Sequence, residues 1–376
     1  GCCDGGLEYF DPATGHARNV RVWPEAAYGW RPADLRYRWH WTFPVVISPH
    51  DNNTVYVGSQ HVHRTRDKGS SWDVISPDLT LNDKSKQGDS GGMTTDNLMT
   101  FDGSVLYALA ESPVQQGVLW SGSNDGQIHV SMDAGETWRN VTANLPGLPE
   151  YGQFSNIEPS RYAAGTAYAA VDLHQMGDFD PYIYRTTDFG ASWSRIDGGI
   201  TRSNFSFVHV VREDPVRPGM LFAGTDNAVW FTLDDGAHWM RLQNNLPAAP
   251  VYWLTIQPHF HDLVVGTYGR GFWILDDITG LRALDSEVMA RRAHVVDPRP
   301  AWRFQSIQGL KSTPSHVFGQ NPRYGASIDV WLSDGAAGPM RTEIVGPDGE
   351  VVRTLSGRGA PGLNRIQWDL RYESPD

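Results

Sequence analysis

One eight-residue pattern recurs four times with fixed internal spacing, and it constrains the fold more than any other feature of the chain. The pattern is Ser/Thr-x-Asp-x-Gly-x-x-Trp, and its copies begin at Thr65, Ser131, Thr186 and Thr232. Before each copy stand a proline, a loop and an apolar stretch that ends in small residues. Self-similarity of this kind is typical of proteins built from repeated supersecondary units.

The interval from the proline to the aspartate of the pattern is nearly constant and fixes the register of the repeats. It is longer only in the third unit, where residues 172–181 form an insertion. A fifth, degenerate copy reads Trp273-Ile-Leu-Asp276-Asp277. Each unit accommodates four short strands, a to d, with the pattern at the turn between c and d. Four-stranded sheets repeated at this spacing predict propeller blades.

We therefore expect an all-β protein, with residues 1–284 forming a propeller of five blades and a partial first one. These blades either make up the ring by themselves or belong to a larger ring. A linker at 285–324 and a small β-sandwich at 325–376 would follow, and we expect the chain to be a fragment or a processed product. One stretch, Leu281–Ala293, reads as an amphipathic helix. The expected blades are a partial one at 1–22 and five more at about 41–76, 105–145, 153–200, 205–246 and 251–284.

Composition excludes several classes of protein. Lys and Arg number 31 against 43 Asp and Glu, for a net charge of −12, whereas nucleic-acid binding needs clustered cations. No apolar run approaches the ~20 residues of a membrane helix. The 15 Trp, 14 Tyr and 14 Phe argue against disorder. Because the two cysteines are the adjacent Cys2 and Cys3, the sequence holds no disulfide framework.

The repeated pattern is the Asp-box of the bacterial-neuraminidase-type (BNR) repeat, and residues 1 to about 284 resemble secreted bacterial proteins described as "glycosyl hydrolase, BNR repeat". The likeness extends to the propellers of sortilin and of xyloglucan hydrolases. It also rests on the segments 41–49, 212–219 and 266–276. Residues 325–372 resemble the Ig-like sandwich of flagellar hook-capping proteins. The resemblance implies a fold and a secreted location, and leaves the activity open.

We interpret the box residues as structural. A tight c–d turn needs a positive φ, which glycine adopts at little cost, and an aspartate accepts backbone N–H bonds across its own turn. The tryptophan would pack between neighbouring blades. The charged run at 212–214 is interpreted in the same way, as an ion pair between blades. The box residues are Asp67, Gly69, Trp72, Asp133, Gly135, Trp138, Asp188, Gly190, Trp193, Asp234, Gly236 and Trp239.

Function is expected at the funnel formed by the b–c and d–a loops, since binding residues concentrate on loops held by a rigid scaffold. Glycoside hydrolysis requires two carboxylates, and Asp125, Asp172 and Asp226 occupy equivalent b–c positions. Each has the alternative of a simple loop-turn residue. Trp41 would either stack on a sugar or pack in the core. The other predicted substrate-binding residues are Trp39, His61, Tyr252, Tyr268 and Arg270.

Two other chemistries receive less support. A sialidase needs an arginine cluster for the substrate carboxylate, and we find no convincing third arginine beside Arg38 and Arg270. Histidines at 50, 61, 63, 259 and 261 are expected to be surface or packing residues. No cofactor is expected, with one alternative: calcium at Asp172, Asp178 and Asp180, whose hard oxygen ligands suit that ion.

Two functions remain open from the sequence. The first is a secreted, periplasmic or cell-surface bacterial propeller that binds or cleaves a polysaccharide at the funnel. The alternative is a non-catalytic, sortilin-like propeller that holds a peptide or protein. Neither involves nucleic acid or a membrane span. A pair of carboxylates in the funnel would favour hydrolysis.

Overall fold

The computed structural model describes residues 5–25, 28–93, 97, 103–304 and 320–373. Cys2 and Cys3 therefore lie outside the described residues. Two compact units are present: unit 1 comprises Gly1–Ile256 and Val264–Trp273, and unit 2 comprises Gln257–Leu263 and Ile274–Asp376. Strands dominate both units, and none of the helices in the described ranges is long and apolar enough to cross a membrane.

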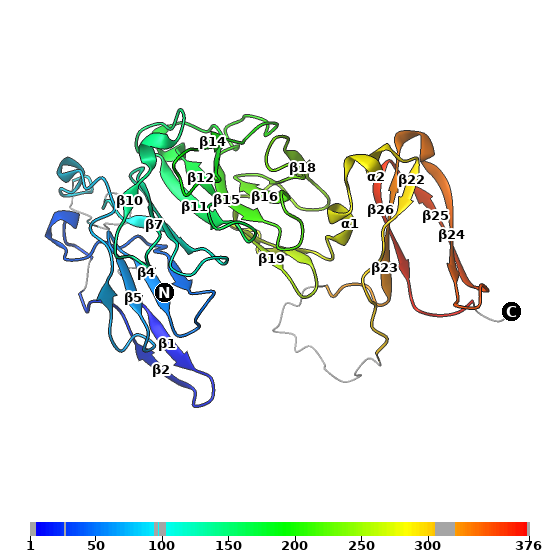
Figure 1. Cartoon of the computed structure of the whole chain (residues 1–376), viewed down its shortest axis with the longest axis horizontal. Helices are drawn as coiled ribbons and strands as arrows, with labels where there is room; N and C mark the ends of the chain where they lie inside the picture. Colours follow the sequence, from blue (N-terminus) through cyan, green and yellow to red (C-terminus); the bar gives the residue numbers. More distant parts are fainter. Residues whose placement is uncertain (1–4, 26–27, 94–96, 98–102, 305–319, 374–376) are drawn as a thin grey trace. The chain divides into compact units, whose positions relative to one another are not determined.

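Unit 1 is an all-β propeller made of consecutive antiparallel sheets, which Figure 1 shows in chain order from blue to yellow-green. Among the described residues, four sheets have four strands each, and every strand pairs with the next one along the chain. These strands are β3 (Val45–Ile47), β4 (Val55–Gly58), β5 (Val62–Thr65), β6 (Asp73–Val74), β7 (Leu106–Glu111), β8 (Leu119–Ser123), β9 (Ile128–Ser131), β10 (Arg139–Asn140), β11 (Gln153–Pro159), β12 (Ala167–Asp172), β13 (Tyr182–Thr186), β14 (Ser194–Arg195), β15 (Val208–Glu213), β16 (Leu221–Thr225), β17 (Val229–Thr232) and β18 (Met240–Leu242).

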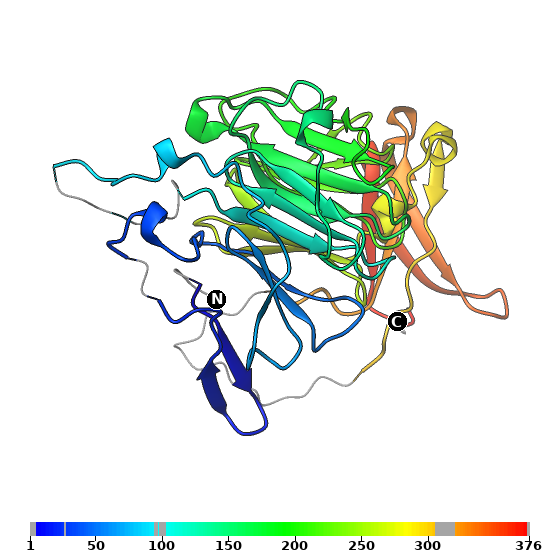
Figure 2. The same cartoon turned by 60° about the vertical axis from the view of Figure 1, so that its left-hand side comes forward.

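A smaller sheet precedes these four sheets and another follows them, and the sheets are numbered from the one that begins with β3. β1 (Glu8–Asp11) and β2 (His16–Asn19) form a hairpin, the blue ribbon at the bottom of Figure 2, which matches a partial blade. In the described residues the fifth sheet has three strands, β19 (Val251–Gln257), β20 (Asp262–Thr267) and β21 (Phe272–Leu275). The fourth strand expected there is absent, because the degenerate box lacks its turn glycine and the chain enters helix α1 (Thr279–Arg282) instead.

Each Asp-box closes its turn with the same local hydrogen bonds. In all four copies the aspartate Oδ1 accepts the backbone N–H four residues later at 2.8 to 2.9 Å. The same oxygen accepts the Ser/Thr hydroxyl at 2.7 to 2.8 Å. The glycine has a positive φ, 96° at Gly135, and a Cβ there would lie 2.8 Å from the Ile75 carbonyl oxygen. Glycine is therefore required by both conformation and space.

The box tryptophans join consecutive sheets. Three indole N–H groups donate to the backbone carbonyl of the residue that follows the fourth strand or its equivalent in the preceding sheet. Trp193 differs, because its buried Nε1 has no hydrogen-bond partner among the described residues and its ring packs edge-on against Trp120 at 5.8 Å. The hydrophobic cores likewise lie between neighbouring sheets. The donating pairs are Trp72–Val20, Trp138–Ile75 and Trp239–Ile196.

A buried polar network also links the third and fourth sheets. The Arg212 guanidinium donates to the Glu158 carboxylate at 2.9 Å, so the expected inter-blade ion pair is present. Glu213 accepts hydrogen bonds from the Ser160 hydroxyl and the Arg161 N–H, and burial raises its pKa. These charges hold blades together and are not free for chemistry.

Unit 2 contains two antiparallel sheets. β22 (Ala293–Val295), β23 (Ala326–Leu332) and β26 (Gly362–Trp368) form one, and β24 (Gly338–Val345) with β25 (Val351–Gly359) forms the other. Its membership of the Ig-like class stays a prediction. β22 lies inside the segment expected to be a linker, so that segment is partly a strand paired with β23.

The single helix expected over 281–293 is instead two short helices. α1 ends at Arg282, and α2 (Ser286–Ala290) begins after Asp285. The Asp285 carboxylate accepts the Val288 N–H at 2.7 Å, which is the geometry of a helix N-cap. The cap starts a new helix at the point where the sequence pattern suggested continuity.

Candidate functional site

The first strands of the five consecutive sheets of unit 1 line one large groove. Its volume is about 1270 Å³, and side chains of β3, β7, β11, β15 and β19 contribute to its wall. This wall combines apolar residues with exposed aromatic rings and a few charged groups. A large concave cavity with a small number of converging polar groups is the usual form of a ligand-binding site.

A β-bulge near the start of the first strand decides which side chain that strand places in the wall of the groove. The register shifts in β7, β11 and β15, and the extra residues are Tyr107, Ser155 and His209. Bulges redirect a side chain at the end of a strand. The corresponding positions of the first and fifth sheets hold Phe43 and Tyr252. All five residues line the groove, so one repeat position, bulged in three of the sheets, presents varied side chains.

His209 forms the polar centre of this wall. Its Nε2 lies 3.1 Å from Asp226 Oδ1, and its Nδ1 lies 3.8 Å from Asp172 Oδ2. The imidazole stacks on Tyr252 with 4.1 Å between ring centroids and 19° between ring planes. Only 6% of His209 is exposed. Two carboxylates and an aromatic face therefore fix the orientation of the ring.

The two carboxylates beside His209 differ in accessibility. Asp172 is buried, and its Oδ1 accepts both the His174 N–H at 2.9 Å and the His174 ring Nδ1–H at 2.7 Å. This hydrogen bond raises the pKa of His174. The Asp226 side chain is more exposed, at 20%. Asp172 lines the groove and Asp226 does not, so Asp226 acts on the groove through its bond to the His209 ring.

Asp125, the third predicted carboxylate, does not join this cluster. Its Oδ1 accepts the Ser123 hydroxyl at 2.5 Å, and its Oδ2 accepts the Leu81 N–H at 3.0 Å. These bonds anchor the loop that leads away from the first blade. The structure thus brings Asp172 and Asp226 together and gives Asp125 a loop-anchoring position.

Among the predicted aromatic residues, Tyr252 and Tyr268 line the groove, with ring centroids 5.7 Å apart. The prediction for Trp39 is wrong, because it is 3% exposed and stacks on buried His63. Trp41 lines the groove instead and is half exposed. β3 begins at Val45, so Trp41 lies in the preceding loop and escapes the packing expected at a strand start.

The other two predicted ligand-binding residues lie away from the groove. The His61 ring Nδ1 lies 3.2 Å from the Ser76 carbonyl oxygen, and Arg270 is an exposed loop residue. Neither lines the groove. The neighbouring His63 belongs to the core: it bonds to Ser59 Oγ at 2.8 Å, and burial lowers its pKa to about 3.

The carboxylates considered for calcium have separate partners. Asp178 accepts the Tyr182 hydroxyl at 2.7 Å, and Asp180 pairs with Arg202 at 2.8 Å. Asp172 is engaged beside His209. Within the described ranges, no three His, Cys, Asp or Glu side chains converge as metal ligands would. The geometry therefore does not fit a shared calcium, and nothing below depends on a metal.

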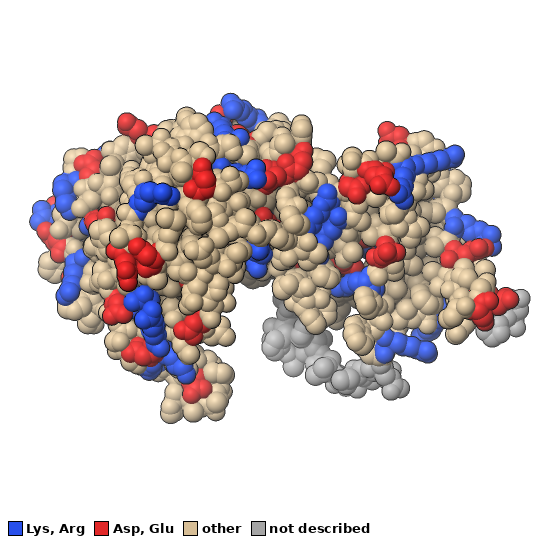
Figure 3. All heavy atoms as spheres, viewed as in Figure 1, with Lys and Arg blue, Asp and Glu red and all other residues tan. Residues whose placement is uncertain are grey.

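The surface charge is mixed. Figure 3 shows acidic and basic side chains interspersed over the face of unit 1 that is drawn, where the described residues form no continuous basic patch. Phosphate backbones are bound by such patches.

Sequence reasoning missed His209, Tyr107 and Ser155. Each lies inside a first strand, where a site residue is predicted from the sequence only in the fifth unit. A usable signal exists: the three residues stand at equivalent repeat positions, second or third in the first strand. Aligning the repeats at that position would have exposed the variation.

Comparisons with known proteins add a partial likeness. No protein-family model matches the chain. A 94-residue stretch, 24% of the chain, is 34% identical to the oligoxyloglucan-reducing end-specific xyloglucanase of Emericella nidulans. The aligned part is only 10% of that protein, so the chain spans a small share of the curated relative it matches.

Solved structures with a related arrangement include two GH74 enzymes. The xyloglucanase of Xanthomonas campestris has a TM-score of 0.49 at 17% identity, over 69% of this chain and 38% of that one. An ancestral GH74 enzyme has a TM-score of 0.44 at 15% identity, over 89% of this chain and 40% of that one. YCF48 bound to D1 peptide has a TM-score of 0.40 at 13% identity, over 68% of this chain and 70% of that one.

Proposed function

We propose that the protein is a carbohydrate-active propeller that binds a neutral polysaccharide along the groove of unit 1. The observation that carries the proposal is the wall formed by His209, Tyr252 and Tyr268, with Asp226 hydrogen-bonded to His209. It places two neighbouring aromatic rings beside an oriented imidazole and a partly exposed carboxylate.

These groups match the chemistry of a sugar. A pyranose presents C–H groups on its face, which pack against an aromatic ring, and hydroxyl groups at its rim, which need donors and acceptors. Tyr252 is 44% exposed and Tyr268 is 74% exposed, so both rings are available to a ligand. The His209 imidazole, which stacks on Tyr252 and is bonded to Asp226, supplies a polar group beside them.

The first substrate class to test is a β-1,4-glucan backbone such as that of xyloglucan. The matched stretch in the Emericella nidulans xyloglucanase supports this choice. A ligand of this kind also places the protein outside the cytoplasm. We propose binding as the activity, because Asp172, one of the two carboxylates, is buried and already holds His174.

The test is affinity electrophoresis in gels that contain xyloglucan, followed by calorimetry with its oligosaccharides. We expect Tyr268→Ala to raise the Kd about tenfold, equivalent to about 1.4 kcal/mol. Tyr372→Ala is the matched control, because Tyr372 is also 74% exposed and lies in unit 2. Equal retardation of both variants, or none of the wild type, would overturn the proposal.

A reducing-end assay separates binding from cleavage. We expect no release of reducing ends by the wild type. Release that is lost in Asp226→Asn would instead make the protein a hydrolase that uses this carboxylate. If the wild type neither binds nor cleaves, the sortilin-like alternative, a peptide or protein ligand, becomes the better explanation.

A further inference from the structure

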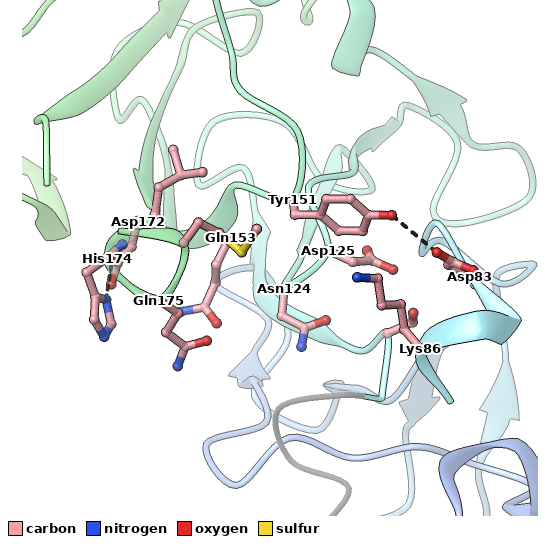
Figure 4. A pocket seen from close by; sticks show the side chains of 12 residues that line it. Asp83, Lys86, Asn124, Asp125, Tyr151, Gln153, Asp172, His174 and Gln175 are labelled. Atoms are coloured by element: carbon pink, nitrogen blue, oxygen red, sulfur yellow. Dashed lines mark hydrogen bonds and ion pairs between the residues drawn. The ribbon is translucent and has the colours of Figure 1, made fainter. Parts of the chain in front are cut away.

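A second, smaller cavity opens beside the groove, and Figure 4 shows its lining. Its volume is about 180 Å³. Loops from three blades form it: the loop after the first blade, the loop at 124–125, and the segments 151–153 and 172–176. Pockets for drug-sized ligands measure ~300–1,000 Å³, so this side pocket has room for about one sugar unit.

The side pocket adjoins the groove. Gln153, Asp172, His174 and Gln175 line both cavities. A chain bound in the groove therefore lies next to the side pocket. The polar cluster around His209 lies close to this junction, since Asp172 belongs to it.

Two amides stand at the junction without internal partners. The side chains of Gln153 and Gln175 form no hydrogen bond with the described part of the chain, whereas the nearby charged groups are bonded. Figure 4 shows both amides on the same side of the cavity. An amide offers a donor and an acceptor together, which is what a sugar hydroxyl requires.

Tyr151 forms another part of the wall, in a strained conformation. Its φ is 59°, a left-handed value that non-glycine residues seldom adopt, and its hydroxyl donates to Asp83 at 3.2 Å. Strain of this kind persists where the structure needs a particular side chain in place, and it clusters at ligand sites. The held ring provides a flat surface across the pocket from the two amides, on the side of Asp83 and Lys86 (Figure 4).

Charge points to a neutral ligand. The pocket contains three carboxylates, Asp83, Asp125 and Asp172, and one lysine, Lys86, whose ammonium lies 5.2 Å from the Tyr151 ring centroid. An anionic sugar would meet an excess of negative charge, which disfavours it electrostatically. The carboxylates are also occupied by internal hydrogen bonds, so they offer little to a cation.

We propose that the side pocket is an additional subsite for one neutral sugar unit, with Gln153 and Gln175 as its hydrogen-bonding residues and Tyr151 as its stacking surface. This rests on the proposed function, because the groove must hold the rest of the chain. The subsite adds affinity only for ligands long enough to reach it.

Calorimetry with β-1,4-glucan oligosaccharides of increasing length tests this. For the wild type we expect affinity to rise by about tenfold at the length that first fills the side pocket. The double variant Gln153→Leu/Gln175→Leu should lose this step and keep the affinity for shorter oligosaccharides. Tyr151→Gly, which accepts the positive φ, should do the same. Gln116→Leu is the control, because Gln116 is exposed and lines neither cavity.

The outcomes separate the two proposals. A groove variant, Tyr268→Ala, should weaken oligosaccharides of every length that binds. If the wild type binds but the glutamine variant affects all lengths equally, or none, the subsite is wrong and the groove stands. If the wild type binds no oligosaccharide, both proposals fail.

Discussion

The Asp-box turn lies in all four of the four-stranded sheets and the bulge at the start of the first strand lies in three of them, and the two features follow opposite rules. At the box, hydrogen-bond lengths agree to about a tenth of an ångström in all four copies. At the bulge the backbone repeats while the side chain changes from tyrosine to serine to histidine. The box keeps the fold uniform, and the bulge lets each blade contribute a different group to the groove.

The largest loss of stability is expected for Trp239→Ala, which removes a box tryptophan. The ring is 4% exposed between the third and fourth sheets, and its N–H donates to the Ile196 carbonyl. We expect the free energy of unfolding to fall by about 3–5 kcal/mol. Urea denaturation followed by circular dichroism measures this. Trp302→Ala, at a site 77% exposed, should change it by less than about 0.5 kcal/mol. Similar losses of unfolding free energy in both variants would contradict the structural role assigned to the box tryptophan.

Lowering the pH should separate the contribution of a buried histidine to stability from that of the box aspartates. Burial lowers the pKa of His63 to about 3, whereas an unfolded histidine titrates near ~6.5. Between these values the unfolded state binds a proton that the folded state does not. Stability should therefore fall by up to about 1.4 kcal/mol per pH unit as the pH drops through this window.

The measurement is the urea midpoint from about pH 7 to about pH 4. His63→Phe should reduce the slope without removing it, because burial also lowers the pKa of His40 and His129 to about 4, and His16→Phe, at an exposed site, should leave it unchanged. The boxes respond at lower pH, since hydrogen bonds from Ser71 and Thr65 lower the pKa of Asp67 to about 2. Their contribution is present above ~4 and is lost as the pH falls toward about 2. If His63→Phe and His16→Phe showed the same pH dependence of the urea midpoint, the separate contribution of His63 would be contradicted.

The smallest of these effects is expected at the box glycine. In Gly135→Ala the new Cβ meets the Ile75 carbonyl at 2.8 Å and the residue keeps a φ of 96°. Left-handed strain alone costs about 1–2 kcal/mol. Gly147→Ala is matched, because φ is 64° there and no atom lies within 4 Å of the added Cβ. Thermal unfolding should show the larger loss for Gly135→Ala, and equal losses would remove the steric part of the argument.

The blades could be predicted from the sequence because the box is local. Its residues lie within eight positions, and the aspartate makes the same contacts in all four copies. The errors arose where a local rule was broken. Asp276 and Asp277 replace a box and end the fifth sheet early, and Asp285 caps a second helix where one was expected.

The site was harder to predict because it is assembled from residues far apart in the sequence. Asp172 and Asp226 were identified as candidates, but His209, which lies between them, is a bulge residue in an apolar strand. The wrong prediction for Trp39, and the position of Trp41 in the groove in its place, have a similar cause. Alternation gives the faces of a strand but not the residue at which the strand begins.

In the three units that form it, the Trp-to-carbonyl bond runs from a later unit back to the one before it, as from Trp138 to Ile75. Each of these units carries its own turn closure and one attachment to its predecessor. A tandem gene duplication that copied one unit would reproduce both at once. Arrays of this kind can lengthen during evolution without redesign of the existing joints, while the bulge residue of each new copy is free to diverge.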